Sequence, residues 1–122
     1  MLMIFSNNPA VRDKYPDLVR YMDCDVQRVF VEVRDAVHMG AVLISHPLSG
    51  SIKPNESPYK SVAVDTPPKR GRQLDLKSLQ IIEDAIVTLR KLPVKNRQYT
   101  DGMLEDFRVI DLDLISSVPP KN

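Results

Sequence analysis

Short apolar runs alternate along the chain with segments whose apolar residues recur every three or four positions. Residues 2–5 and 41–44 are such runs, and residues 61–64 form a third strand candidate. Short runs of this kind predict strands buried on both faces. A weaker candidate, residues 18–22, contains Arg20 and is expected at an edge of the sheet.

Two segments have the period of an amphipathic helix. The first carries Val26, Val29, Phe30, Val33 and Val37, and the second carries Leu79, Ile82, Ile86 and Leu89. Asp23 or Asp25 can cap the first helix, and Gly40 can end it because glycine adopts the left-handed conformation without penalty. Asp75 can cap the second helix, which should end before Pro93.

Two further helices are expected. Pro9 can begin a short helix over residues 9–14, since the first turn of a helix does not use the missing N–H. In the tail, the spacing of Met103, Phe107, Ile110 and Leu114 fits a helix. The alternation of Ile110, Leu112 and Leu114 with aspartates also fits a strand, and we favour the helix.

The order of these elements predicts an α/β fold. We expect a small three-layer domain, Rossmann-like or flavodoxin-like, with a mostly parallel sheet of about four strands in the order 2-1-3-4. Residues 1–118 should form one domain, followed by a frayed tail at residues 119–122. Ligands bind such sheets where the strand order reverses, here beside the loops at residues 6–8 and 45–47.

Composition restricts the partners. Seventeen Lys and Arg against sixteen Asp and Glu leave a net charge of +1, which favours neither nucleic acid nor an anionic membrane. The cluster of Lys69, Arg70 and Arg72 lies among prolines and glycine and is expected to be a solvated loop. The first apolar run is too short to span a membrane and lacks a signal-peptide pattern. The lone Cys24 suits the cytoplasm, where disulfides are rare.

The segment HPLSGSIKPNESPYKS, residues 46–61, is the main candidate for a functional site. Connections this long are usually functional or disordered, and its three prolines and apolar side chains favour order. The Ser49-Gly50-Ser51 backbone and a lysine suit an anion or a small polar ligand. A rigid loop that only closes the edge of the sheet is the alternative.

We expect the ligand to contact both the residues that follow the first strand and this loop. The candidate residues are Asn7, Asn8, His46, Ser49, Gly50, Ser51, Lys53, Asn55, Tyr59 and Lys60. No nucleotide-binding motif is present. A serine hydrolase would have to use Ser49, His46 and Glu56 from one loop without a nucleophile elbow, so no catalytic residue is assigned.

Neither a metal nor a cofactor is expected. Two histidines and one cysteine are spread along the chain, which provides no zinc ligand set. Asp106, Asp111 and Asp113 scatter around a helix and are interpreted as a solvated face. His46 can be a proton-transfer group or a hydrogen-bonded structural residue, and both interpretations remain open.

Residues 46–61, together with Ser6-Asn7-Asn8-Pro9 and with Arg34-Asp35, His38 and Gly40, resemble the GrdX family. The resemblance covers nearly the whole chain. It implies an association with the glycine, sarcosine and betaine reductase systems of amino-acid-fermenting anaerobes, which depend on selenium, and a cytoplasmic location. It provides no catalytic residues to transfer.

Three functions are compatible with these observations. The preferred one is a non-catalytic accessory protein that binds a small polar, anionic or amino-acid-like ligand, or a reductase subunit, through residues 46–61. The second is a small enzyme acting on an amino-acid derivative, with His46 in proton transfer. The third is a protein-interaction module that uses Tyr59 and the prolines. Each is compatible with a homo-oligomer.

Overall fold

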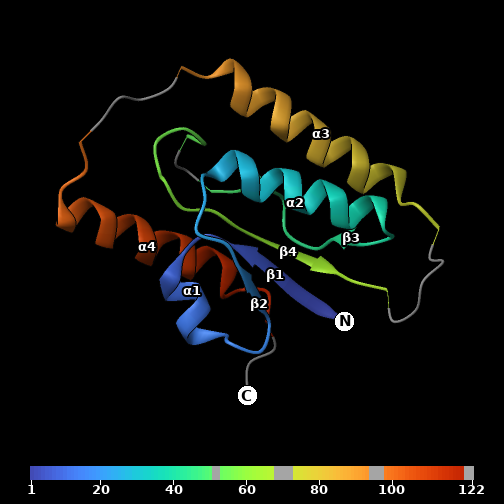
Figure 1. The fold of residues 1–122 in the computed structure, drawn as a ribbon, viewed down its shortest axis with the longest axis horizontal. Helices are drawn as coiled ribbons and strands as arrows, with labels where there is room; N and C mark the ends of the chain where they lie inside the picture. Colours follow the sequence, from blue (N-terminus) through green and yellow to red (C-terminus); the bar gives the residue numbers. More distant parts are fainter. Residues whose placement is uncertain (51–52, 68–72, 94–97, 120–122) are drawn as a thin grey trace.

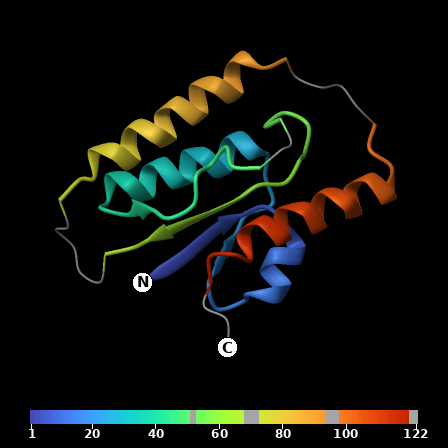
Figure 2. The same ribbon diagram turned by 180° about the vertical axis from the view of Figure 1, so that it is seen from behind.

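The computed structural model describes residues 1–50, 53–67, 73–93 and 98–119. These residues form four strands and four helices in an open α/β arrangement (Figure 1). In chain order the elements are β1 (Leu2–Ser6), α1 (Pro9–Lys14), β2 (Val19–Tyr21), α2 (Val26–His38), β3 (Val42–Leu43), β4 (Ser61–Asp65), α3 (Leu76–Lys91) and α4 (Asp101–Ile115). Helices α2 and α3 cover one face of the sheet, and α1 and α4 cover the other (Figures 1 and 2).

The sheet is mixed, with the strand order β2-β1-β4-β3. Strands β1 and β2 are parallel, whereas β4 runs antiparallel to both β1 and β3. The α/β class is therefore confirmed, but the predicted order 2-1-3-4 and the mostly parallel sheet are wrong. A Rossmann-like or flavodoxin-like arrangement is not confirmed, because the two central strands of this sheet are antiparallel.

The length of the strands explains this order. Strand β3 has two residues, and its side chains are only partly buried, so it can fill an edge position but not a central one. Strand β4 has five residues, of which the first four are buried, and it takes the central position beside β1. The long segment between β3 and β4 allows the chain to turn back and pair antiparallel.

Alternate residues of the two central strands supply two separate cores. Phe5, Val62 and Val64 face α2 and α3, where they pack against the predicted valine stripe of α2 and against Ile82 and Ile86 of α3. Ile4 and Ala63 face the other side and pack against Val11 of α1 and Ile115 of α4. This period of two explains how β1 and β4 are buried on both faces.

Each helix begins at a capping side chain, and of these Asp25 and Asp75 are the caps that the sequence predicted. Asn8, Asp25, Asp75 and Thr100 each accept a hydrogen bond from a backbone N–H in the first turn of α1, α2, α3 and α4, respectively. Gly40 follows α2 with φ +103°, as expected for a residue that ends a helix. The tail helix and the short edge strand β2 are confirmed.

Some predictions concern segments outside the described residues. These are the structure of the basic cluster at Lys69, Arg70 and Arg72, the contributions of Ser51 and Ile52 to the loop, and the end of the tail at residues 120–122. Across the parts of the chain that the structure describes, no helix has the length and apolar character needed to cross a bilayer.

Candidate functional site

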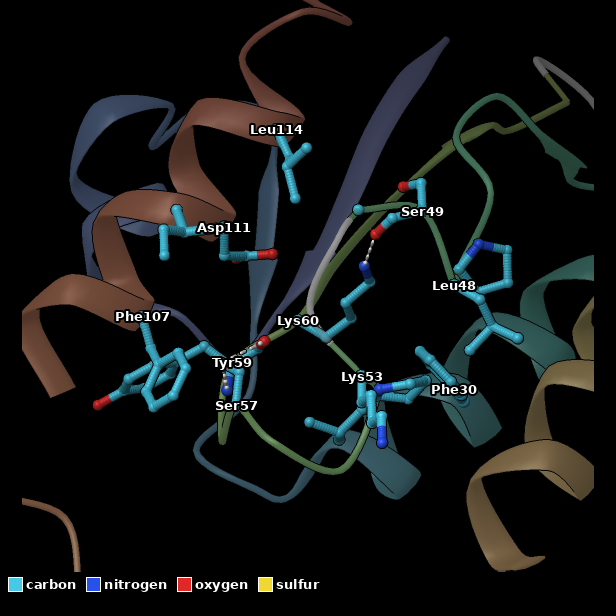
Figure 3. Close-up of a pocket in the computed structure, with 15 residues that line it drawn as sticks. Phe30, Leu48, Ser49, Lys53, Ser57, Tyr59, Lys60, Phe107, Asp111 and Leu114 are labelled. Carbon is cyan, nitrogen blue, oxygen red and sulfur yellow. Dashed lines mark hydrogen bonds between the residues drawn. The ribbon is translucent and has the colours of Figure 1, made fainter. Parts of the chain in front are cut away.

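Three strand ends meet at one edge of the sheet and position a cleft. Strands β1 and β3 end there, and β4 begins there, with Ser6 paired to Ser61. The Ser45 hydroxyl accepts the Ala63 N–H at 2.8 Å, which fixes the start of the connection from β3 to β4. This connection and α4 enclose two adjoining hollows, which share Ser49, Lys60, Asp111 and Leu114. Figure 3 shows the smaller of the two.

A buried carboxylate joins α4 to this edge. Asp111 is 6% exposed, and its Oδ1 accepts the Ser61 N–H at 3.0 Å. Its Oδ2 accepts the Ser61 hydroxyl at 2.7 Å and the Asn8 side-chain amide at 3.0 Å. Since the Ser61 proton goes to Asp111, the Ser6 hydroxyl donates to Ser61 Oγ at 2.6 Å. The network holds α4, β4 and the end of β1 in a fixed arrangement.

Asn7 connects the end of β1 to Cys24 and to the residues that precede β4. Its Nδ2 donates to the carbonyls of Cys24 and Pro58, both at 2.8 Å, and its Oδ1 accepts the Lys60 N–H at 2.8 Å. Asn8 caps α1 and donates to Arg108 O and to Asp111. The two amides on which we expected a ligand to bind therefore use their donor hydrogens on protein groups, and they position the loop.

Lys60 supplies the positive charge where the two hollows meet. Its Nζ donates to the Ser49 carbonyl at 2.7 Å (Figure 3). Among the described residues this is its one hydrogen bond, and no carboxylate lies within ion-pair distance. Burial lowers the pKa of the Lys60 amine, and the charge of Asp111 opposes this shift in part. An ammonium has three donors, so two remain for a ligand.

Helix α4 forms an apolar wall opposite the loop. Phe107, Ile110 and Leu114 line the smaller hollow, and Phe30 and Leu48 lie on its other side. This hollow has a volume of about 40 Å³, whereas the hollow beside His46 has about 290 Å³. The cleft therefore combines a narrow apolar part with a wider polar part.

Gly50 closes the loop against this wall. Its φ is +114°, a conformation that side chains disfavour. A Cβ at this position would lie 2.9 Å from Leu114 Cδ1. The backbone conformation therefore requires glycine, and an added Cβ would also displace the end of the Leu114 side chain.

His46 lies at the mouth of the wider hollow and is exposed. Its Nδ1 accepts the Leu48 N–H at 3.0 Å, so the proton of the neutral ring is on Nε2. In this tautomer the imidazole can donate to a ligand but has no free basic nitrogen. The geometry therefore agrees with the hydrogen-bonded structural interpretation of His46.

The structure distributes the remaining candidate residues over both sides of the loop. Lys53 lines the narrow hollow, is exposed and has no ion pair with a described residue. The Tyr59 hydroxyl accepts the Arg108 guanidinium at 3.1 Å, which ties the loop to α4. Asn55 lies on the opposite side, where its Nδ2 donates to Pro93 O at 2.8 Å. Ser51 is outside the described residues.

Asp111 is the most important residue that the sequence analysis missed. Its assignment to a solvated helix face is wrong, because it is buried and accepts three hydrogen bonds. The sequence did contain a signal. Asp111 follows Phe107 by four positions and precedes Ile115 by four, so it occupies an apolar position of the helix. A carboxylate at such a position predicts a buried polar network.

Metal ligands do not gather at this cleft. Among the residues that the structure describes, no three His, Cys, Asp or Glu side chains are placed to share an ion. Cys24 is a free thiol that lies behind the loop, near Asn55, and burial raises its pKa. The chemistry of the cleft is therefore that of two lysines, one engaged carboxylate, several hydroxyls and an apolar wall.

Comparison with known proteins identifies a family and no individual relative. No curated protein and no solved structure matches the chain. A family model described as GrdX-like protein matches residues 3–119. This range includes β1, the connection between β3 and β4, and α4, and so contains every element that forms the cleft. The chain belongs to the GrdX-like protein family.

Proposed function

We propose that this protein is a non-catalytic, cytoplasmic accessory protein of a glycine, sarcosine or betaine reductase system. In this role it binds a small anionic ligand in the cleft between α4 and the connection from β3 to β4. The family assignment supports the association with a reductase system. The cleft supports the binding function, since it combines polar groups with an apolar wall, as small-molecule sites do.

The charge of Lys60 is the observation that carries the binding proposal. Its ammonium is half-buried and, among the described residues, has a single acceptor, the Ser49 carbonyl. The nearby Asp111 carboxylate is already engaged by Ser61 and Asn8. A cation that is partly desolvated and not paired is stabilised by an anionic ligand.

A reductase subunit is the second candidate partner. Three apolar side chains lie exposed around the cleft: Ile44 is 48%, Ile110 39% and Leu114 41% exposed. Apolar side chains beside a polar rim are typical of protein interfaces. The enzymatic alternative has less support, because His46 already uses Nδ1 as an acceptor.

A thermal-shift screen tests the binding proposal. Glycine, sarcosine, betaine, acetyl phosphate and inorganic phosphate are added to the wild-type protein and to the variant Lys60→Met. We expect at least one anion to raise the melting temperature of the wild type and to have little effect on Lys60→Met. Lys77→Met, on α3 and outside both hollows, serves as the matched control and should respond like the wild type.

A pull-down distinguishes the two partners. Tagged protein is incubated with extract of an amino-acid-fermenting anaerobe, and the wild type is compared with Ile110→Asp. Capture of a reductase subunit that is lost in Ile110→Asp would support the protein partner.

In the thermal-shift screen, no response of the wild type to any anion, with equal behaviour of Lys60→Met, would refute ligand binding at this cleft.

A further inference from the structure

We propose that the cleft selects a short-chain monocarboxylate without an α-amino group. Its carboxylate binds Lys60 in the wider hollow, and its hydrocarbon tail enters the narrow hollow beside Phe107, Ile110 and Leu114. This inference rests on the proposed function, because it specifies which anion the same cleft takes.

The charges around the cleft favour a singly charged head group. Lys60 and Lys53 line it as cations, and Asp111 is the one carboxylate among the described residues that line the two hollows. The local balance is therefore one positive charge. A monoanion neutralises this charge, whereas a dianion such as a phosphate monoester adds repulsion with Asp111. The Ser45 hydroxyl in the wider hollow accepts the Ala63 N–H and keeps its own proton, so it can donate to the second carboxylate oxygen.

The hydrogen bonds of Asp111 disfavour an amino acid. The α-ammonium of an amino acid needs acceptors, and a carboxylate provides about four lone-pair sites. Asp111 already accepts three hydrogen bonds from Ser61 and Asn8. An additional ammonium beside Lys60 would place two cations together beside a carboxylate that has at most about one lone-pair site left.

The narrow hollow sets the length of the tail. Its lining is mostly apolar, with Phe30 and Leu48 opposite the wall formed by α4. A water-sized group needs about 10–15 Å³ of such volume. The hollow of about 40 Å³ therefore accepts about three carbon-sized groups, which corresponds to the tail of butyrate.

Calorimetric titration with sodium acetate, propionate, butyrate and hexanoate tests the tail. Burial of each methylene should tighten binding about fourfold, so butyrate should bind about 15-fold more tightly than acetate. Hexanoate should bind no more tightly than butyrate, because the hollow is full. Leu114→Ala widens the hollow at a half-exposed position and should shift the optimum toward hexanoate while the protein stays folded.

Butyramide, 2-aminobutyrate and butyl phosphate test the head group. Each should bind at least about tenfold more weakly than butyrate, since each lacks the charge or adds one that the cleft does not neutralise. Lys60→Met should lose butyrate binding to the same extent, and Lys77→Met should not. Circular dichroism of each variant confirms that it is folded.

The outcomes separate this inference from the proposed function. Equal affinities for acetate and butyrate, or tighter binding of 2-aminobutyrate or butyl phosphate, would overturn the monocarboxylate while leaving an anion site in place. Binding of inorganic phosphate alone would do the same. If no anion binds and Lys60→Met behaves as the wild type, the proposed binding function itself fails.

Discussion

The Asp111 carboxylate offers the most direct test of how α4 is held against the sheet. The substitution Asp111→Asn keeps the size and shape of the side chain but replaces one oxygen by an NH₂ group. One carboxylate oxygen accepts from Ser61 N, and the other accepts from Ser61 Oγ and Asn8 Nδ2. An amide cannot serve both sets, so at least one buried donor faces an NH₂ group.

The expected cost follows from these bonds. A hydrogen bond to a charged group contributes about 1.5–3 kcal/mol, and an unsatisfied buried donor costs about 1–3 kcal/mol. The amide oxygen keeps part of the network, so we expect a loss of about 3 kcal/mol in the free energy of unfolding. A domain of this kind has a stability of about 5–15 kcal/mol, so the variant should still fold.

Urea denaturation followed by circular dichroism measures this loss. With a slope of about 1.5 kcal/mol per molar urea, the midpoint should fall by about 2 M. Asp113→Asn is the matched control, because Asp113 is exposed on the same helix and should change stability by less than about 0.5 kcal/mol. A loss for Asp111→Asn as small as that of the control would show that the carboxylate does not hold α4. Additive effects of Asp111→Asn and Ser61→Ala would contradict the direct bond between them.

Three further predictions follow from the same region. Gly50→Ala should cost about 1–3 kcal/mol in urea denaturation because φ is +114°, and adding Leu114→Ala should not restore stability, since the strain is in the backbone. Burial lowers the pKa of Lys60 in the folded state, so between this lowered pKa and the usual lysine pKa the unfolded state binds more protons than the folded state. The urea midpoint should therefore rise with pH in this range, and the midpoint of Lys60→Met should not. Equal pH profiles of the two proteins would contradict the prediction. Burial raises the pKa of Cys24, so iodoacetamide at pH 8.5 should alkylate it more slowly than a free cysteine, and an equal rate would contradict the expectation.

Local patterns in the sequence predicted most of the elements. The valine stripe of α2 and the caps at Asp25 and Asp75 depend on residues only a few positions apart, and both are confirmed. The tail helix followed from the spacing of Phe107, Ile110 and Leu114. Side-chain period and capping act over one or two turns, so a single sequence contains them.

The pairing of the strands could not be predicted in the same way. Periodicity does not show whether the strand at 61–65 lies between β1 and β3 or at the edge of the sheet beyond β3. The choice depends on contacts between distant segments. The pairing of Ser6 with Ser61 joins residues 55 positions apart. A run of four apolar residues at 41–44 suggested a central strand, but only Val42 and Leu43 pair.

The cleft could be predicted only in part from the sequence, because it too depends on long-range contacts. The sequence identified one wall, the connection from β3 to β4, from its length and its prolines. It did not identify α4 as the other wall, because nothing local relates Asp111 to Ser61 or Arg108 to Tyr59. The antiparallel course of β4 brings Ser61 to the end of β1, and the predicted parallel sheet would have placed it elsewhere.

The antiparallel pairing of β3 with β4 has an evolutionary consequence. It makes residues 44–60 the loop of a wide hairpin, held at one end by Ser45 and at the other by Asn7. Insertions or substitutions between those two anchor points leave the register of the central strands unchanged. Selection can therefore alter what this segment recognises without rebuilding the scaffold beneath it.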